Sequence, residues 1–500
     1  MSNSKSVFKE VGFKESIEAL VTEIQEIYLS DDVPWVVGYS GGKDSTAVLQ
    51  LVWLALSRLD PAQRKKSIHV ISTDTLVENP VVAAWVNKSL ETMKSKAEED
   101  GVPIIPHRLT PDIENSFWVN LIGRGYPAPR PKFRWCTERL KINPANTFVK
   151  GIVRESGEAI MVLGVRKAES AARAASITRN SQNRVRDKLS QSSSLSSCLI
   201  YSPVEEWSND DVWMFLMQIG NPWGYNNRDL LTMYQGASPD GECPLVVDTS
   251  TPSCGDSRFG CWVCTLVEKD KSMQAMIQND DEKEWMLPLL KLRNELDVAD
   301  DTPLRDFRRM KGMVQLFNGR LVHGPYTQES REAWLRKLLE AQLSIKRNPR
   351  TPENIREIEL ITMAELGEIR RIWLTEKHEL EDSLPRIYEE ITGEVFDVDG
   401  FESHVAFGAE EMMILKKICE GQQTRYELSR ELLSITQSFS SQSRRAGLYN
   451  ELERAIRRGF YKDKDDAFDF AQRKQQMYAD LEPTESGLSD LEPGSEREGS

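Results

Sequence analysis

The residues best suited to chemistry form the turn SGGKDS at positions 40–45, between two apolar stretches. A kinase-type phosphate loop has the pattern G-x-x-x-x-G-K-[ST], but no glycine stands at the required distance before Lys43, because Gly38 is too close. The turn therefore does not predict a γ-phosphate site of that kind. Its glycines still let the backbone approach a phosphate, and the N–H groups of the following helix provide a positive end. We predict nucleotide contacts from Ser40, Gly41, Gly42, Lys43, Asp44 and Ser45, with Lys43 and Asp44 also acting in the reaction.

Asp44 is unfavourable beside a phosphate on Coulomb grounds. We therefore expect its carboxylate to cap the helix or to hold a metal ion. The simplest alternative for the whole turn is an ordinary tight connection from strand to helix. The serines on both sides of the glycine pair and the β-like run before them favour the phosphate site.

Four cysteines lie close together in CPLVVDTSTPSCGDSRFGCWVC, with the spacing C-x10-C-x6-C-x2-C. Thiolates from one loop-rich segment are typical ligands of a zinc ion or an iron–sulfur cluster, and the spacing does not choose between them. Four unrelated buried thiols are the less favoured alternative. The predicted metal ligands are Cys243, Cys254, Cys261 and Cys264.

Cys136 stands apart, between Arg134 and Arg139. Nearby positive charge lowers the pKa of a thiol, so we expect a reactive thiolate able to carry a persulfide in sulfur transfer. Cys198, beside a Ser-rich loop, and Cys419, on an apolar helical face, are expected to be packing residues.

The elements that must position these residues alternate between β-rich and helical runs over the first 265 residues. This alternation predicts a doubly wound α/β domain with a parallel five-stranded sheet. Ligands bind such sheets at the carboxyl ends of the strands, and the SGGKDS turn follows the first strand. The predicted strands span 33–40, 67–75, 102–109, 159–166 and 198–204.

Beyond residue 266 apolar residues recur at helical spacing, with charged faces between them. We predict a nucleotide-binding domain at 1–240, the cysteine-rich segment at 241–266, a helical region at 267–395 and a small helical module at 396–478. The pattern of that module is compatible with a winged-helix-like fold or a plain small bundle. The Pro-, Glu- and Ser-rich end, 479–500, is predicted to be a disordered acidic tail.

The composition is that of a globular protein, with 39% hydrophobic and 28% charged residues. We find no apolar run near the roughly 20 residues of a membrane span and no signal peptide, so we expect a cytoplasmic protein without a membrane partner. The net charge of −14 argues against a protein that coats nucleic acid everywhere. Residues 121–190 nevertheless hold fifteen Lys and Arg against five Asp and Glu, which gives this acidic protein one basic segment.

The turn at 40–45 resembles the loop of the ATP pyrophosphatase (PP-loop) superfamily, whose signature is Ser-Gly-Gly-x-Asp-Ser after the first strand. The resemblance implies a loop that grips the β,γ-pyrophosphate of ATP while an acceptor oxygen attacks the α-phosphate to give an adenylate. The Mg²⁺ that accompanies ATP would neutralise the leaving pyrophosphate.

Four further segments are similar to phosphoadenosine phosphosulfate (PAPS) reductases and their relatives: STDTLVENP at 72–80, RWCTERLKINP at 134–144, LGVRKAESAAR at 163–173 and SPVEEWSNDDVW at 202–213. In this set Asp74 would orient Mg²⁺ or ribose, although a strand-end Asp is equally typical of a helix cap, and Gly164 would let a nucleoside lie against the strand end. Iron–sulfur members of the family take cysteine ligands from the region of Cys136, which makes this residue alternatively a cluster ligand. The arginines expected to hold anionic oxygens or DNA are Arg134, Arg139, Arg166 and Arg173, with Arg166 also acting in the reaction.

The PP-loop turn, the cysteine-rich segment and the helical remainder together resemble the DndC family of DNA phosphorothioation enzymes. This resemblance implies an ATP pyrophosphatase and sulfurtransferase with a [4Fe-4S] cluster, zinc being the alternative. It also implies DNA as substrate, a cysteine desulfurase as sulfur donor, and the proteins DndD and DndE as partners in a complex. DNA would contact the basic segment 121–190.

Three other functions stay open. A tRNA-thiolating enzyme would share the loop, the cluster and the persulfide, but the chain has no recognisable RNA-binding module. A PAPS reductase-like enzyme would need a cysteine in a Glu-Cys-Gly-x-His context near its C-terminus, and that context is missing. A non-catalytic scaffold would not need the intact turn at 40–45.

Overall fold

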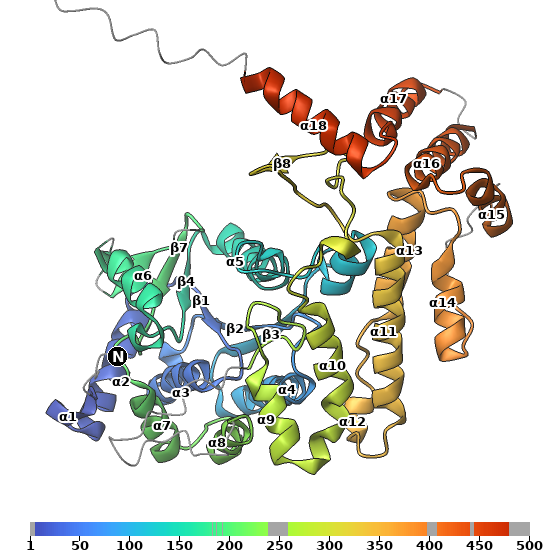
Figure 1. Ribbon diagram of the computed structural model, residues 1–500. Helices are drawn as coiled ribbons and strands as arrows, with labels where there is room; N and C mark the ends of the chain where they lie inside the picture. The colour runs from blue at the N-terminus through green and yellow to red at the C-terminus, as the bar shows by residue number, and fades with distance from the viewer. Residues whose placement is uncertain are drawn as a thin grey trace, which may run out of the picture.

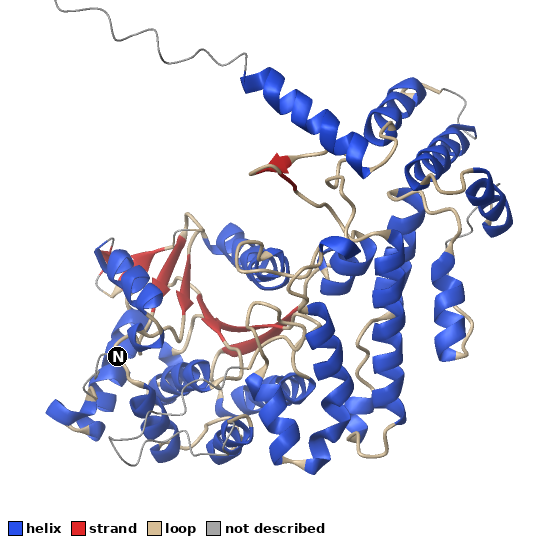
Figure 2. Ribbon diagram, in the orientation of Figure 1, coloured by secondary structure: helices blue, strands red, loops and turns tan. Residues whose placement is uncertain are grey.

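The computed structural model describes residues 6–479 except 183, 187, 193, 239–258, 398–407 and 441–444. Cys243, Cys254 and the predicted tail beyond residue 479 lie outside the described residues. The described chain has a sheet-containing part formed by its first half and a helical part formed by its second half (Figures 1 and 2).

The first part is built on a seven-stranded sheet with the order β3-β2-β1-β4-β7-β6-β5. The first five of these strands run parallel, and all five were predicted from the sequence. The other two, β5 and β6, pair antiparallel at one edge and were not predicted, because their Arg- and Ser-rich stretch has no alternating apolar pattern. The strands are β1 Trp35–Gly38, β2 Ile68–Thr73, β3 Ile104–Leu109, β4 Ala159–Val162, β5 Arg184–Arg186, β6 Leu189–Gln191 and β7 Cys198–Tyr201.

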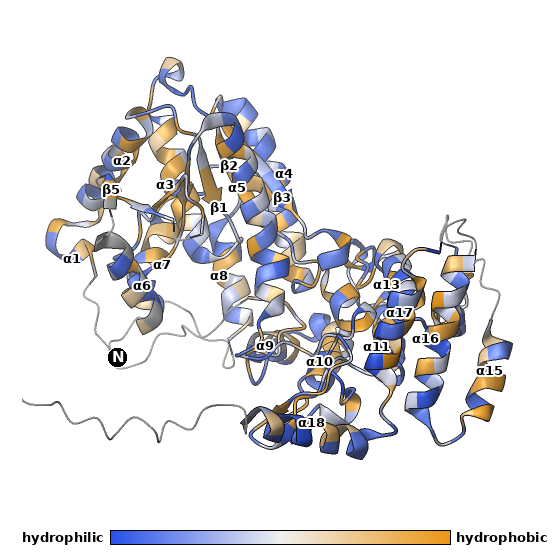
Figure 3. Ribbon diagram, turned by 90° about the horizontal axis from the view of Figure 1, so that it is seen from above, coloured by the Kyte–Doolittle hydropathy of each residue, from blue (hydrophilic) through white to orange (hydrophobic). Residues whose placement is uncertain are grey.

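Helices cover both faces of this sheet, as a parallel sheet requires. Successive residues of β1 point to opposite faces, so that Trp35 and Val37 join one apolar core while Val36 joins the other. α3 is buried along most of its length, and Figure 3 shows its apolar character beside β1. The helices of this part are α1 Phe8–Val11, α2 Phe13–Leu29, α3 Lys43–Ser57, α4 Pro80–Asp100, α5 Asn143–Ser156, α6 Ala171–Gln182, α7 Asn209–Gln218 and α8 Asn227–Gly236.

A second apolar core joins the helical part to a segment of the first half. Between β3 and β4 the chain leaves the sheet, and the π-helical turns η3 (Val119–Gly123) and η4 (Thr137–Ile142) pack into this second core. There the indole N–H of Trp373 donates to the carbonyl of Ile122 at 3.0 Å. The second core thus takes residues from both sides of the boundary predicted near residue 240. Its helices are α9 Lys271–Asn279, α10 Leu287–Leu296, α11 Gln328–Arg347, α12 Glu353–Arg356, α13 Met363–Thr375 and α14 Ser383–Thr392.

The described part of the C-terminal module is helical, with one more helix than the three that were predicted. Its helices are α15 Ala409–Ile418, α16 Gln423–Ser440, α17 Leu448–Gly459 and α18 Lys464–Ala479. Within the region predicted to be helical, the chain forms a two-stranded hairpin from β8 (Leu316–Phe317) and β9 (Arg320–Leu321). Among the described residues, no helix combines the length and the apolar character of a membrane span.

Candidate functional site

The SGGKDS turn connects β1 to α3 at the carboxyl edge of the sheet. Gly41 has a φ of +73°, and a Cβ on it would lie 2.5 Å from Cγ2 of Val86, so this position requires glycine. Gly42 precedes the first residue of α3, which places the N-terminus of that helix at the turn. The hydroxyls of Ser40 and Ser45 lie 3.1 Å apart. The turn therefore combines a close backbone approach, a helix N-terminus and hydroxyl donors, as an anion site needs.

The loop after β4 lies directly against this turn. A Cβ on Gly164 would come within 2.9 Å of the carbonyl carbon and oxygen of Asp44. Gly164 thus makes room for the backbone of the turn, and its contact with a nucleoside stays a prediction. Because the chain order reverses between β1 and β4, this contact lies at the switch point where doubly wound sheets bind ligands.

A buried arginine anchors the acidic residue of the turn. Arg166 is 3% exposed, and its Nε donates to Oδ1 of Asp44 at 2.6 Å. Nζ of Lys43 lies 3.0 Å from the other oxygen of the same carboxylate. Asp44 makes no helix-capping hydrogen bond, so that expectation is wrong. Both of its oxygens are engaged by cations, and this donor set does not fit a direct metal ligand.

Tyr234 of α8 is a site residue that sequence reasoning missed, because no motif marks it. Its hydroxyl accepts a hydrogen bond from the backbone N–H of Lys43 at 3.3 Å, and burial raises the pKa of Tyr234. Its ring meets the ring of Phe259 edge to face, with centroids 4.7 Å apart. Tyr234 therefore links the nucleotide turn to the chain that leads into Cys261.

The loop after β2 brings the cysteine-rich segment to the same edge of the sheet. Asp74 forms an ion pair with Arg108 and accepts the N–H of Leu76 at 2.8 Å. The N-cap of α4 is Asn79, so a helix-capping role for Asp74 is wrong. The carbonyl of Val77, two residues before Asn79, accepts the N–H of Trp262 at 3.0 Å. This hydrogen bond fixes the segment that carries Cys261 and Cys264 beside the loop after β2.

Three cysteines come together here: Cys136, Cys261 and Cys264. Sγ of Cys261 lies 3.3 Å from the hydroxyl of Thr75 and 3.7 Å from a carboxylate oxygen of Glu78. Cys264 follows three residues later, and Cys136 packs against the same apolar core as Cys261. Burial, helped by the Glu78 carboxylate, raises the pKa of Cys261 to about 12. The negative charge of Cys261 in turn raises the pKa of Lys141, whose ammonium group lies 3.3 Å from Glu78.

The predicted lowering of the Cys136 pKa is wrong. Burial raises the pKa of this thiol. The two flanking arginines do not lower it, because they turn away from it. Arg134 is exposed and donates to the carbonyl of Pro131 at 3.2 Å. Arg139 donates to the side-chain oxygens of Asn115 at 2.9 Å and of Tyr126 at 3.0 Å.

Cysteine sulfurs are typical ligands of an iron–sulfur cluster or of zinc, so these three residues fit such a group by donor type. Within the ranges that the structure describes, no three His, Cys, Asp or Glu side chains are arranged closely enough to hold a metal ion. The two remaining predicted ligands, Cys243 and Cys254, lie outside those ranges. The described thiols are therefore part of a ligand set at most.

Most of the basic segment 121–190 is engaged within the protein. Arg173 of α6 pairs with Glu169 at 2.6 Å, and Arg130 pairs with Asp297 at 2.9 Å. Arg186 pairs with Asp31 at 2.6 Å. The segment is thus less available to an external polyanion than its composition suggests.

The two predicted packing cysteines are confirmed. Cys198 is fully buried in β7, and burial raises the pKa of its thiol to about 11. Cys419 is buried at the end of α15.

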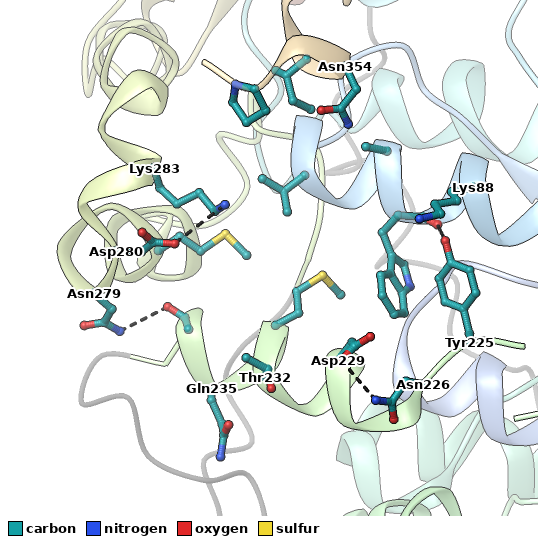
Figure 4. A pocket seen from close by; sticks show the side chains of 18 of the residues that line it. Lys88, Tyr225, Asn226, Asp229, Thr232, Gln235, Asn279, Asp280, Lys283 and Asn354 are labelled. Carbon is teal, nitrogen blue, oxygen red and sulfur yellow. Dashed lines mark hydrogen bonds and ion pairs between the residues drawn. The ribbon is translucent and has the colours of Figure 1, made fainter. Parts of the chain in front are cut away.

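A wide groove of about 970 Å³ lies on another side of α4, between this helix, α8, α9 and α12. Figure 4 shows the polar side chains that line it, among them Lys88, Asp229 and Lys283. Trp85 lines this groove and also lies against Gly41, so its indole separates the groove from the nucleotide turn. None of the predicted site residues lines the groove.

Residues 34–225 match the family model of the phosphoadenosine phosphosulfate reductase domain. The uncharacterized protein MJ0066 of Methanocaldococcus jannaschii is 25% identical over 245 residues, which are 49% of this chain and 39% of that protein. The chain therefore spans well under half the length of this curated relative.

Two solved structures were compared as well. The PAPS reductase of Candida auris in a phosphate complex is 13% identical with a TM-score of 0.27, over 44% of this chain and 90% of that one. The U34-tRNA thiolase NcsA of Methanococcus maripaludis with its [4Fe-4S] cluster is 12% identical with a TM-score of 0.30, over 60% of this chain and 85% of that one. The match to the phosphoadenosine phosphosulfate reductase domain includes the strand–turn–helix at residues 35–57 that carries the SGGKDS turn.

Proposed function

We propose that the protein is an ATP pyrophosphatase and sulfurtransferase that replaces a phosphate oxygen of the DNA backbone by sulfur. The observation that carries the proposal is the common edge at which the nucleotide turn and three cysteines meet. Tyr234 contacts the turn on one side and Phe259 on the other, two residues before Cys261. A site for ATP and a site for sulfur are thereby joined by one line of contacts.

In the first step the turn holds the pyrophosphate end of ATP. The helix N-terminus after Gly42 and the charge of Lys43 stabilise the negative charge that develops there. Arg166 is a positioning residue, because it holds the Asp44 carboxylate and reaches the turn only through it. An oxygen of the DNA phosphate attacks the α-phosphate, pyrophosphate leaves, and an adenylate forms.

In the second step sulfur at the sulfide level attacks the activated DNA phosphorus, and AMP leaves with the oxygen. Activation is needed because a phosphodiester oxygen is a very poor leaving group, whereas AMP is a better one. A cysteine desulfurase would supply the sulfur as a persulfide, and a thiol reductant would supply the two electrons that bring it to the sulfide level. DndD and DndE would act as partners in a complex.

Two cofactors belong to the proposal. Mg²⁺ would arrive with the phosphates of ATP, since the carboxylates of Asp44 and Asp74 are held by arginines. A [4Fe-4S] cluster, or zinc, would be held by Cys261 and Cys264 with Cys243 and Cys254. Cys136 packs against the same apolar core as Cys261, and it would act either as a further ligand or as a persulfide carrier. When bound, the cluster would supply a place for sulfur near the activated phosphate.

Reduction of a sulfonucleotide is a second candidate, because the matched family model is that of PAPS reductases. Its nucleophilic cysteine would have to come from the C-terminal region. The last cysteine of the chain is Cys419, which is buried in α15 and lies in no Glu-Cys-Gly-x-His context. Sulfur transfer is therefore better supported than sulfonucleotide reduction.

Mass spectrometry of nuclease-digested DNA tests the proposal. Phosphorothioate dinucleotides should be present in cells with the wild-type gene and its partners, and absent with Lys43→Ala. Loss of thiolated tRNA nucleosides instead would establish a tRNA-thiolating enzyme, and unchanged nucleic acids with loss of sulfite formation would establish a reductase.

A further inference from the structure

A projecting finger, residues 305–326, rises from the helical part toward the C-terminal module (Figure 1). Its root is closed by the bridge between Arg305 and Tyr326, and its tip is the hairpin of β8 and β9. Asn318 and Gly319 both have positive φ, +48° and +70°, and Phe317 pairs with Arg320 across them. These angles belong to the tight turn that Asn-Gly favours, so the tip has a defined shape.

The finger is braced from several sides. Arg308 forms ion pairs with Asp306 and with Glu427 of α16. Gly312 lies against the side chain of Arg458 in α17, and Nζ of Lys377 lies 3.7 Å from Sδ of Met310. Holding this element in place is thus one role of the C-terminal helices.

The exposed side chains of the finger are of two kinds. Phe317 is 69% exposed at the tip. Arg309, Lys311 and Arg320 are exposed, and none of them forms an ion pair with a carboxylate in the described parts of the chain. In a protein with a net charge of −14, a finger with five Lys and Arg against one Asp is an isolated positive element.

The root of the finger adjoins the loop that leads to the cysteines. The N–H of Tyr326 donates to the carbonyl of Gly125 at 2.7 Å, and its hydroxyl accepts the N–H of Ala128 at 3.1 Å. From there the chain runs through exposed Phe133 to Cys136. The root of the finger is therefore in contact with the segment that leads to Cys136.

We propose that the finger is the DNA-binding element of this protein, which rests on the proposed function. Free cations on one projecting hairpin fit a row of backbone phosphates, since phosphate contacts dominate affinity for DNA. The aromatic ring at the tip packs against a base, either on its face or as a wedge between base steps. This assigns the DNA contact to residues 305–326, whereas seven of the fifteen cations of the basic segment 121–190 are held in ion pairs of the described chain.

Fluorescence anisotropy with the full-length protein and a labelled duplex DNA of mixed sequence tests the proposal. The triple variant Arg309→Gln, Lys311→Gln, Arg320→Gln should bind at least about tenfold more weakly. The slope of log K against log salt should fall by about 0.9 for each DNA phosphate that the variant no longer neutralises. The matched control changes three exposed cations elsewhere to Gln: Lys65, Lys94 and Arg228, none of which forms an ion pair with a described residue. This control should keep the wild-type affinity and the wild-type salt slope.

The aromatic tip is tested separately. Phe317→Ala should weaken binding by about fivefold or more, as expected when one base is no longer stacked, with an unchanged salt slope, and Phe317→Trp should restore the affinity. A structural role for the ring would instead appear as a lower melting temperature without rescue by Trp. Wild-type DNA affinity in both the triple variant and Phe317→Ala would overturn the proposal. The proposal would also be overturned if these variants lost affinity for tRNA but kept wild-type affinity for DNA.

Failure of the finger and failure of the proposed function give different results. If phosphorothioate levels in cells are the same with the triple variant and with wild type, the finger is not the DNA-binding element. If wild-type cells contain no phosphorothioate while the triple variant still loses DNA affinity in vitro, the DNA-binding role of the finger is supported and the sulfur-transfer function is wrong.

Discussion

Gly164 gives the sharpest test of how the nucleotide turn is held. In Gly164→Ala the new methyl group would lie 2.9 Å from the carbonyl carbon and oxygen of Asp44 and 3.1 Å from the amide nitrogen of Ser45. All three atoms belong to the backbone, so no flexible side chain can move aside. Ordinary contacts begin near 3.4 Å, and the turn must therefore shift by about half an ångström.

The size of the effect follows from that shift. Added volume in a tightly packed site typically costs about 1–3 kcal/mol. A misplacement of about 1 Å in a site reduces the rate about 100-fold, so half of that predicts a loss of about tenfold in pyrophosphate release from ATP. The loss should lie in kcat, because the turn can still hold ATP but no longer aligns it.

Urea unfolding and a pyrophosphate-release assay measure the two quantities. Gly151→Ala is the matched control, since a Cβ there meets nothing within 4 Å and the residue lies inside α5. Gly151→Ala should stabilise the protein by about 0.5–1 kcal/mol and leave the rate of pyrophosphate release unchanged. If Gly164→Ala unfolds at the wild-type urea concentration and releases pyrophosphate at the wild-type rate, then packing between the two loops does not set the geometry of the site.

Three further changes test other contacts. Arg166→Met should destabilise the protein by about 1–3 kcal/mol in urea unfolding and lower pyrophosphate release, because it leaves Asp44 without its buried partner; unchanged stability would contradict the ion pair. Tyr234→Phe removes the acceptor of a buried amide of the turn, so a loss of about 1 kcal/mol is expected, and a wild-type unfolding midpoint would show that water replaces the hydroxyl. Burial lowers the pKa of both His69 and His107, so the folded state favours the neutral rings; stability should be full above the ordinary pKa of 6.5 and decline as the pH falls below it. Melting temperatures between pH 7.5 and pH 5 should fall less steeply in His69→Phe than in wild type, and equal slopes would assign the acid sensitivity to other groups.

The five parallel strands and the SGGKDS turn could be predicted from the sequence. Five strands follow from continuous apolar runs, and the loop at 40–45 follows from its glycines, because both depend on neighbours in the chain. The packing role of Gly164 could not be predicted, since only the fold shows that the backbone of Asp44 fills the space beside it.

Contacts between segments far apart in the chain could not be predicted from the sequence. The ion pair of Arg166 with Asp44 and the contact of Tyr234 with the turn join residues more than a hundred positions apart. The Cys136 pKa was predicted from two flanking arginines, but Arg134 donates to Pro131 and Arg139 donates to Asn115 instead. The β8–β9 hairpin was missed although Asn318-Gly319 is a strong local signal, because the helical spacing around it dominated the prediction.

The second core has a practical consequence for anyone who wants to isolate the matched domain. Phe117, Trp118, Leu121 and Ile122 lie inside residues 34–225, yet they are covered by helices that begin only after residue 270. A fragment cut to the family boundaries would expose this apolar surface to water and would aggregate. The nucleotide site therefore cannot be trimmed away from the helical half, and both must be expressed as one polypeptide for either to be studied.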